Sequence, residues 1–345
     1  MICKYGKSVG DIGRAKKTYF DDNDVLVAKQ NEYADIYKMQ PLRHACKMCG
    51  TTWNEGISYE SHGLNYVICK KCGHVSGIYE ETEEYCKNLY SDSDYGAYTY
   101  SEKDQKDYDD RLEKIYKPKA SFLFEVLEQE GIDIGNIEIL DIGAGSGYFV
   151  SACDDFGVFA NGVDMSKHQI NYGKKCLHNS RRNGEIRHIQ NDELVLYLQQ
   201  TTANVISAIG VLEHLIDFHK ILEAIHENRN IKYFYFMVPM FGLSNILETL
   251  LPDVFNRHLG GPHTHVFSHE SVEYMCNKYE MDMIAKWQFG TDIMDLYRMC
   301  MVKNNKTKLT DEIYEKFYPC IDAMQAVLDK NDFCSEIHVV CKKKN

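Results

Sequence analysis

The sequence lacks the features that would place the chain in a membrane or on a nucleic acid. It has no run of about 18 apolar residues, roughly the length that a helix needs to cross a bilayer. Positive charge is also scarce, because 39 Lys and Arg stand against 51 Asp and Glu. The resulting net charge of −12 repels phosphate backbones. We therefore expect a soluble protein without a membrane span, for which nucleic acid is an unfavourable partner.

The first residues, MICKYGKSVG, also lack a secretion signal, because they contain neither an apolar stretch nor a small-residue cleavage site. The chain nevertheless contains 13 cysteines. In a protein without an export signal, cysteines are expected as thiols or metal thiolates in a reducing compartment. We therefore expect a cytoplasmic location.

Four of the cysteines form two closely spaced pairs, each followed by a glycine, and they are Cys46, Cys49, Cys69 and Cys72. Each C-x-x-C turn lets two sulfurs converge, and two such turns on adjacent hairpins complete a tetrahedron around zinc. Four thiolates leave no open position for water, so the predicted zinc is structural. The alternatives are four unrelated cysteines, or a site that uses the flanking residues His44 or His74.

Two segments flank this predicted zinc ribbon of residues 44–80. Residues 1–43 show no sustained periodicity, and we treat them as an extension. Residues 81–110 are acidic and rich in tyrosine, which fits either a solvated linker or a lid in which Tyr95 contacts the substrate. Apolar residues then recur at helical spacing over residues 110–130, where Pro118 predicts a division into two helices.

The strongest chemical signal begins at Glu138, where EILDIGAGSGYF predicts a strand, a glycine-rich turn and the start of a helix. Gly143, Gly145 and Gly147 allow the backbone to turn tightly and to approach a ligand, with helix N–H groups directed at it. A dinucleotide-binding fingerprint would require glycine where this chain has Tyr148. The loop therefore favours a ligand other than a pyrophosphate.

The pattern D-x-G-x-G-x-G at residues 141–147 resembles the first motif of class I S-adenosylmethionine-dependent methyltransferases. The resemblance implies that Asp141 and the glycine loop bind the methionine part of the cofactor. Asp164 ends the next apolar run and is followed by Met165, at the place where doubly wound folds direct a carboxylate at ribose hydroxyls. The alternative role for Asp164 is a helix N-cap. Asn191 and Asp192 follow a third run, where this family commonly contacts adenine, although a turn explains them equally well.

The segment NVISAIGVLEHL, residues 204–215, matches the family's motif after the fourth strand. Glu213 and His214 emerge at the carboxyl end of that predicted strand, the side on which open α/β sheets bind ligands. Imidazole titrates near neutrality and suits proton removal. His214 is therefore a candidate catalytic base and Glu213 a candidate acceptor contact, with loop packing as the alternative role for His214.

Three histidines precede a further predicted helix that Ser268 caps, and they are His263, His265 and His269. A metal site and an ordinary polar loop are both open interpretations. The resemblance implies instead that His265 and Phe267 lie beside the acceptor pocket. His265 is then a second candidate for the base, and His263 and Phe267 are candidate substrate contacts.

From residue 44 onward the sequence resembles a bacterial subgroup associated with sugar nucleotides and surface polysaccharides, which includes zinc-containing sugar methyltransferases. The resemblance implies an α/β fold with a Rossmann-like, doubly wound, seven-stranded sheet whose last strand is antiparallel, preceded by a small N-terminal zinc-ribbon domain. The expected units are residues 1–43, 44–80, 81–117 and 118–345.

The expected reaction is methyl transfer from S-adenosylmethionine to a hydroxyl, or a carbon, of a sugar or sugar nucleotide. Alternatives are an RNA methyltransferase and a non-catalytic zinc-containing interaction protein. The acceptor and the oligomeric state stay open.

Overall fold

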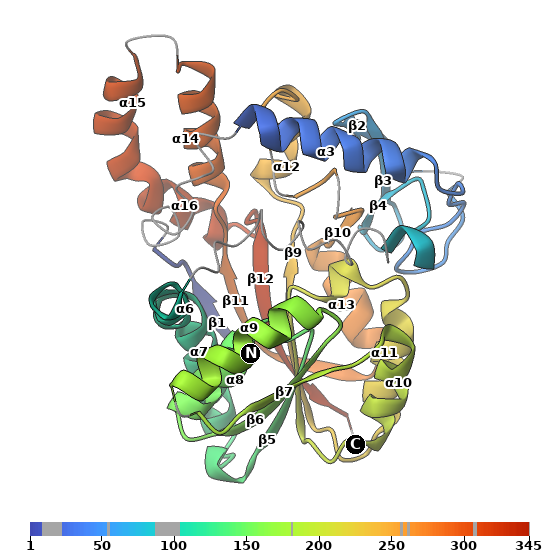
Figure 1. The fold of residues 1–345 in the computed structure, drawn as a ribbon. Helices are drawn as coiled ribbons and strands as arrows, with labels where there is room; N and C mark the ends of the chain where they lie inside the picture. Colours follow the sequence, from blue (N-terminus) through green and yellow to red (C-terminus); the bar gives the residue numbers. More distant parts are fainter. Residues whose placement is uncertain are drawn as a thin grey trace.

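The structure, a computed structural model, describes residues 1–8, 23–53, 56–86, 104–180, 182–255, 258–260, 263–305 and 309–344. The fold is α/β and Rossmann-like, with one large, mostly parallel sheet between layers of helices. Figure 1 shows a second, smaller sheet together with helices α3 (Asn23–Lys38), α12 (Leu243–Leu250) and α14 (Asp292–Lys303) beyond one end of the large sheet.

The large sheet has eight strands in the order β1-β11-β12-β9-β8-β5-β6-β7. In chain order they are β1 (Ile2–Tyr5), β5 (Glu138–Ile142), β6 (Phe159–Asp164), β7 (Glu185–His188), β8 (Val205–Ile209), β9 (Tyr233–Pro239), β11 (Met281–Phe289) and β12 (Glu336–Lys343). The last strand, β12, is antiparallel to both of its neighbours, as expected. The expected count of seven strands is corrected to eight among the described residues. Strand β1 lies parallel to β11 at the sheet edge, and its four residues alternate between exposed and half-buried, which is too short a pattern to predict.

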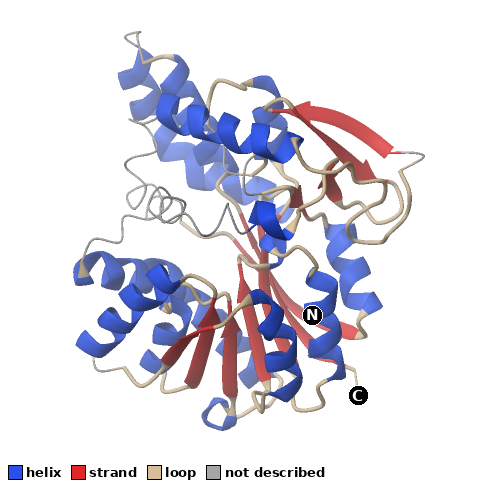
Figure 2. Ribbon diagram, turned by 45° about the vertical axis from the view of Figure 1, so that its right-hand side comes forward, coloured by secondary structure: helices blue, strands red, loops and turns tan. Residues whose placement is uncertain are grey.

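Helices before and between the strands cover both faces of the sheet (Figure 2). They are α6 (Gln105–Arg111), α7 (Lys117–Gln129), α8 (Tyr148–Asp155), α9 (Lys167–Asn179), α10 (Asn191–Gln200), α11 (Phe218–Glu227) and α13 (His269–Lys278). Helices α15 (Leu309–Phe317) and α16 (Ile321–Lys330) complete a helical group with α14. None of the helices in the described ranges is both long and apolar enough to cross a membrane.

The predicted division at Pro118 takes the form of a change in helix type. Helix α6 continues into a π-helical turn, η1 (Leu112–Tyr116), and α7 begins directly after it. Pro118 lies in the first turn of α7, directly after η1, and it has no N–H to donate to a carbonyl of the preceding turn, so the regular helical hydrogen bonding is interrupted here.

The small sheet has the order β10-β4-β3-β2, with strands β2 (Gly56–Ser61), β3 (Leu64–Cys69), β4 (Val75–Gly77) and β10 (His265–Val266). Its fourth strand therefore comes from the far part of the chain, nearly 200 residues after β4. The residue after β10, Phe267, donates its backbone N–H to the carbonyl of Pro239 at the end of β9 (3.0 Å). The segment around β10 thus joins the small sheet to the carboxyl edge of the large sheet. The division into units at residues 43, 80 and 117 stays a prediction.

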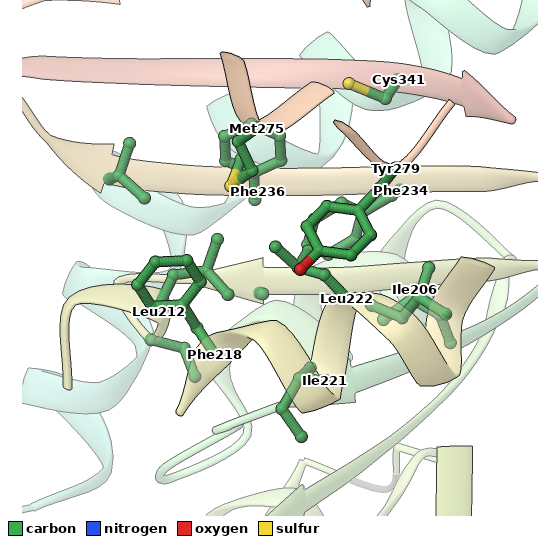
Figure 3. Packing of buried hydrophobic residues seen from close by; sticks show 14 of the residues in the cluster. Ile206, Leu212, Phe218, Ile221, Leu222, Phe234, Phe236, Met275, Tyr279 and Cys341 are labelled. Atoms are coloured by element: carbon green, nitrogen blue, oxygen red, sulfur yellow. The ribbon is translucent and has the colours of Figure 1, made fainter. Parts of the chain in front are cut away.

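One hydrophobic core lies between the large sheet and helices α10, α11 and α13. In Figure 3, Phe218 and Leu222 of α11 lie against the strand that carries Phe234 and Phe236. The same cluster contains Met48 and three of the four paired cysteines, Cys46, Cys69 and Cys72. A second core on the opposite face packs α7 and α8 against the sheet, and Figure 2 shows the sheet between these two helical layers. The cysteine-bearing turns are therefore part of the main core.

Candidate functional site

The glycine-rich turn connects the end of β5 to the start of α8. Gly143, Gly145 and Gly147 have φ angles of 66°, 54° and 72°. This left-handed region is strained for any residue with a Cβ. A Cβ built on Gly143 would lie 2.5 Å from Cγ2 of Val211, so the turn touches the loop that follows β8. The glycines are therefore required both by the backbone conformation and by the close approach of a second loop.

Asp141 lies inside the sheet directly below this turn. It is paired with Ser207 across strands β5 and β8, and the Ser207 hydroxyl donates a hydrogen bond of 2.6 Å to the Asp141 carboxylate. Only 3% of Asp141 is exposed. Burial raises the pKa of its carboxyl group to about 7, against the opposing effect of the Ser207 hydrogen bond. In this structure Asp141 fixes the end of β5 from within the sheet.

Asp164 connects the turn to the next strand. One carboxylate oxygen accepts from the backbone N–H of Gly145 (2.8 Å), and the other accepts from the N–H of Ser166 (2.7 Å). The N-cap of α9 is Ser166, whose side chain accepts from Gln169, so the cap role considered for Asp164 belongs to its neighbour. A carboxylate has about four acceptor positions, which leaves capacity for two ribose hydroxyls. Met165, beside it, is 45% exposed.

The third predicted cofactor contact lies after β7. Helix α10 begins at Asn191, so Asn191 and Asp192 form the first turn of a helix. Glu193 accepts from the backbone N–H of Gln190 (2.8 Å), which satisfies one amide at this helix start. The exposed residue Asp192 thus lies at the same edge of the sheet as the glycine turn and Asp164.

The loop after β8 carries two of the predicted acceptor-side residues in the short helix η3 (Leu212–His214). Glu213 is only 4% exposed, and burial raises the pKa of its carboxyl group to about 8. Its Oε2 atom has no hydrogen-bond partner among the described residues. The other oxygen, Oε1, lies 3.9 Å from Nε2 of His214, whose side chain is 24% exposed. A buried carboxyl group therefore lies behind a histidine that is accessible at the ligand edge.

His263 completes this group, with its ring centroid 4.8 Å from that of His214. One ligating atom from each of Glu213, His214 and His263 lies within 4.8 Å of the others. Two half-buried imidazoles and a buried carboxyl group are well suited to accept and hold a proton. Because Val211 touches the glycine turn, this group lies next to the predicted cofactor site.

The other two histidines of this segment turn away from His214. His265 is fully buried, and its Nδ1 lies 3.0 Å from Nε2 of His74. Burial lowers the pKa of His265 well below its ordinary value, so the ring stays neutral. His269 points toward Asp332, with Nε2 3.9 Å from a carboxylate oxygen. Among the described residues, these three histidines therefore form no common metal site.

Two of the predicted acceptor-side residues lie in the interior of the protein. Phe267 is fully buried, with its ring centroid 5.0 Å from that of His74. Neither Phe267 nor His265 is exposed in this structure, and the substrate contact at Phe267 and the base at His265 stay predictions. Both side chains join β10 to the ribbon. Tyr95, the predicted lid contact, lies outside the described residues.

The four paired cysteines converge. The Sγ atoms of Cys46 and Cys72 are 3.6 Å apart, as are those of Cys49 and Cys69, and all four lie within 4.8 Å of one another. Four sulfurs at about 2.3 Å from a zinc ion form a tetrahedron with edges of about 3.8 Å, so the donor set fits zinc. The glycine after each pair donates its N–H back to the first cysteine of that pair, at 2.9 and 2.8 Å. The flanking residue His74 binds His265 instead of joining the sulfurs.

One residue that the sequence pattern did not single out is Tyr108. Its ring stacks on Tyr148 (4.4 Å between centroids), and its hydroxyl donates to the carbonyl of Ser146 within the glycine turn (3.2 Å). The same hydroxyl lies 2.5 Å from that of Ser151 on α8. Tyr108 therefore supports the turn from below. In the sequence, Tyr108 and Leu112 are spaced to lie on one face of a helix. This spacing predicts that Tyr108 is buried, and it does not predict its contact with the glycine turn.

Comparison with known proteins identifies the family. Residues 102–286, more than half of the chain, match a family model described as a methyltransferase domain. A search of curated proteins finds none whose sequence matches this chain.

Several solved methyltransferases are similar to this chain at low identity. Magnesium protoporphyrin IX methyltransferase from Synechocystis PCC 6803 is 9% identical, with a TM-score of 0.43 over 68% of this chain and 87% of that one. Geranyl diphosphate C-methyltransferase from Streptomyces coelicolor is 12% identical, with a TM-score of 0.42 over 74% and 88%. A methyltransferase from Geobacter sulfurreducens is 14% identical, with a TM-score of 0.39 over 66% and 91%. Similarity at this level assigns no substrate.

The family match includes the glycine turn, Asp164 and the loop that carries Glu213 and His214. This chain therefore belongs to the methyltransferase domain family and is an S-adenosylmethionine-dependent methyltransferase.

Proposed function

We propose that the enzyme methylates an oxygen of a sugar or nucleotide-linked sugar used in surface polysaccharide synthesis, with a sugar carbon as the second choice of acceptor atom. The observation that supports proton removal from such an acceptor is the group formed by buried Glu213 and half-buried His214 and His263. This group lies beside the glycine turn, at the edge where a methyl donor and an acceptor would meet.

Several residues would hold the cofactor. The turn at Gly143–Gly147 and the amino end of α8 would receive the methionine part, because unpaired N–H groups at a helix start favour a carboxylate. Asp164 would accept from the ribose hydroxyls, while Met165, Asn191 and Asp192 would contact adenine. When bound, the cofactor supplies an electrophilic methyl group on a positively charged sulfur.

The protein's own contribution is alignment of the acceptor and removal of its proton. His214 would accept the proton that the acceptor hydroxyl loses when it is methylated. Before this step, Glu213 is neutral at pH values below its pKa of about 8. After the step, it would face the imidazolium form of His214. A neighbouring positive charge favours the carboxylate form, so the buried carboxyl group would stabilise the protonated base.

The acceptor class rests on charge and on the arrangement of the chain. A net charge of −12 disfavours an RNA acceptor. A zinc ribbon, a tyrosine-rich segment and a methyltransferase core occur in the same order in zinc-containing sugar methyltransferases, which the sequence resembles. We propose that Cys46, Cys49, Cys69 and Cys72 hold a structural zinc ion, because their four sulfurs fit a tetrahedron.

The test combines binding with methyl transfer. Calorimetry with S-adenosylhomocysteine measures the cofactor site, and transfer from labelled S-adenosylmethionine is followed on a panel of sugar nucleotides, with total RNA as the competing acceptor. We expect cofactor binding and label on at least one sugar nucleotide. Label on RNA alone would refute the sugar assignment, and absence of any cofactor binding would refute the proposed cofactor site.

A further inference from the structure

A buried lysine reaches from the zinc ribbon to the loop that carries His214. Lys47 lies between the two cysteines of the first pair, and its side chain is only 5% exposed. Its Nζ donates to the backbone carbonyl of Leu215, the residue after His214, at 2.9 Å. In return, Nε2 of His219 on α11 donates to the backbone carbonyl of Lys47 (3.1 Å). The first cysteine turn is therefore bonded both to the acceptor-side loop and to the start of α11, the helix that follows it.

Glu81 extends this connection to the segment that carries His263. Its Oε2 pairs with Lys47 (3.1 Å) and with Arg43 (2.5 Å), and its side chain is 7% exposed. Its other oxygen accepts from the hydroxyl of Thr264, the residue after His263. The Lys47–Glu81 ion pair thus bonds to the neighbour of His214 on one side and to the neighbour of His263 on the other.

Side-chain packing alone does not fill this region. A cavity of about 270 Å³ lies beside the ion pair, and its lining includes Lys47, Glu81, Ile216 and Phe218. Where a loop borders a cavity, directional bonds set its position more strongly than packing does. A buried ion pair often gives little net stability, because desolvation offsets the attraction. Its more valuable contribution is to define one arrangement of the groups that it touches.

We infer that the Lys47–Glu81 ion pair is the positioning element of the acceptor side, coupling the zinc ribbon to the relative placement of His214 and His263. The catalytic meaning of this inference rests on the proposed function. The structural coupling itself does not, because it concerns bonds within the chain.

The chain contains a matched control for Lys47. Lys70 occupies the same position in the second cysteine pair, directly after its first cysteine, but it is exposed. Lys47→Met and Lys70→Met therefore make the same chemical change at the same distance from the cysteines. Methionine keeps much of the length of lysine and removes the charge.

The measurement is hydrogen–deuterium exchange of the full chain, read on peptides that cover residues 211–217 and 263–267. Zinc content and affinity for S-adenosylhomocysteine are measured on the same samples. In Lys47→Met we expect exchange in 211–217 to rise by about tenfold, because the loop loses its anchoring bond. Zinc content and cofactor affinity should stay unchanged, and Lys70→Met should match the wild type. Unchanged exchange in a zinc-loaded Lys47→Met protein would overturn the inference.

Glu81→Gln covers the case in which Lys47→Met loses zinc or fails to fold, because Glu81 lies outside the cysteine turns. This variant should raise exchange in both peptides. Wild-type exchange in both would overturn the inference. In the double variant, exchange should rise by less than the sum of the increases in the two single variants, since both substitutions remove the same connection.

Failure of this inference is distinguishable from failure of the proposed function. Exchange requires no acceptor, so faster exchange without transfer to any sugar nucleotide would support the coupling and refute the acceptor class. Where a sugar nucleotide is methylated, Lys47→Met should lower kcat while leaving the KM for S-adenosylmethionine unchanged. Transfer at the wild-type rate with unchanged exchange would refute the coupling alone.

Discussion

The proposed site at the carboxyl edge of the large sheet has a cofactor half and an acceptor half, and the two are built in different ways. The cofactor half comes mainly from the continuous stretch 138–166, in which β5 pairs with β6 and Asp164 bonds to the glycine turn, with Ser207 and Tyr108 as more distant contacts. The acceptor half is assembled from residues 43–81, 211–217 and 263–267, which are distant in sequence and meet through side-chain bonds, core packing and one shared sheet. The cofactor half should therefore tolerate changes elsewhere in the chain, whereas the acceptor half should depend on the ribbon.

The test of this difference with the largest expected effect is removal of the predicted zinc. Cys49→Ser should abolish stoichiometric zinc and destabilise the ribbon by roughly 4 kcal/mol or more, since structural zinc supplies folding energy directly. Metal analysis and limited proteolysis within residues 46–73 would measure both effects. Affinity for S-adenosylhomocysteine should change by less than about threefold, because local bonds hold the cofactor half. A parallel loss of zinc and of cofactor binding would show that the two halves are not independent.

The opposite test changes the cofactor half alone. Gly145→Val should weaken cofactor binding by at least about 100-fold, because a β-branched residue is strained at φ 54° and its Cβ would lie 2.6 Å from Oε1 of Gln169. Zinc content should stay at the wild-type level. The control is Gly157→Val, since Gly157 has a similar φ of 73° but open space around it. Equal cofactor affinity in Gly145→Val and the wild type would disprove the loop assignment.

The same contrast explains which parts of the molecule could be predicted from sequence. The strand, turn and helix around Gly145 were predictable because their signals are local. Asp164 was placed correctly at the end of its strand, and its bond to the Gly145 N–H lies within the same stretch. The cysteine pairs were predictable for the same reason, since each pair forms its own turn.

The residues whose surroundings could not be predicted depend on contacts between distant segments. His265 has an ordinary loop sequence around it, and only its pairing with β4 and its bond to His74 bury it. Lys47 and Lys70 occupy equivalent positions in equivalent motifs, yet one is buried and the other exposed. No local pattern separates such residues, because the difference arises from what the fold places against each turn. The role of the acceptor side was therefore harder to predict than that of the cofactor side.

A third test separates chemistry from binding within the acceptor half. His214→Gln should lower the rate of methyl transfer by about 100-fold, in the usual range for loss of a general base. Calorimetry with S-adenosylhomocysteine should show unchanged affinity, since His214 lies on the acceptor side. His178→Gln, an exposed position at the end of α9, serves as the control. Wild-type turnover in His214→Gln would exclude this residue as the base.

The test with the smallest expected effect concerns the buried carboxyl groups of the two halves. Asp141 on the cofactor side has Ser207 as a hydrogen-bond donor, whereas Oε2 of Glu213 has no partner among the described residues. Burial raises the pKa of Glu213 to about 8. The folded state therefore binds more protons than the unfolded state between the ordinary glutamate pKa, about 4.3, and 8, and stability must fall as pH rises through this interval.

Glu213→Gln removes this titration and keeps the shape of the side chain. Its melting temperature relative to the wild type should therefore rise by a few degrees, roughly 2 to 5 °C, between pH 5 and pH 9. Thermal unfolding across this range measures the difference, and Glu223→Gln, an exposed position on α11, should show no such trend. A constant difference between Glu213→Gln and the wild type at all pH values would mean that Glu213 ionises at its ordinary pKa. The carboxyl group would then already be charged before His214 receives a proton, and proton removal on the acceptor side would depend on a preformed carboxylate rather than on one formed during the reaction.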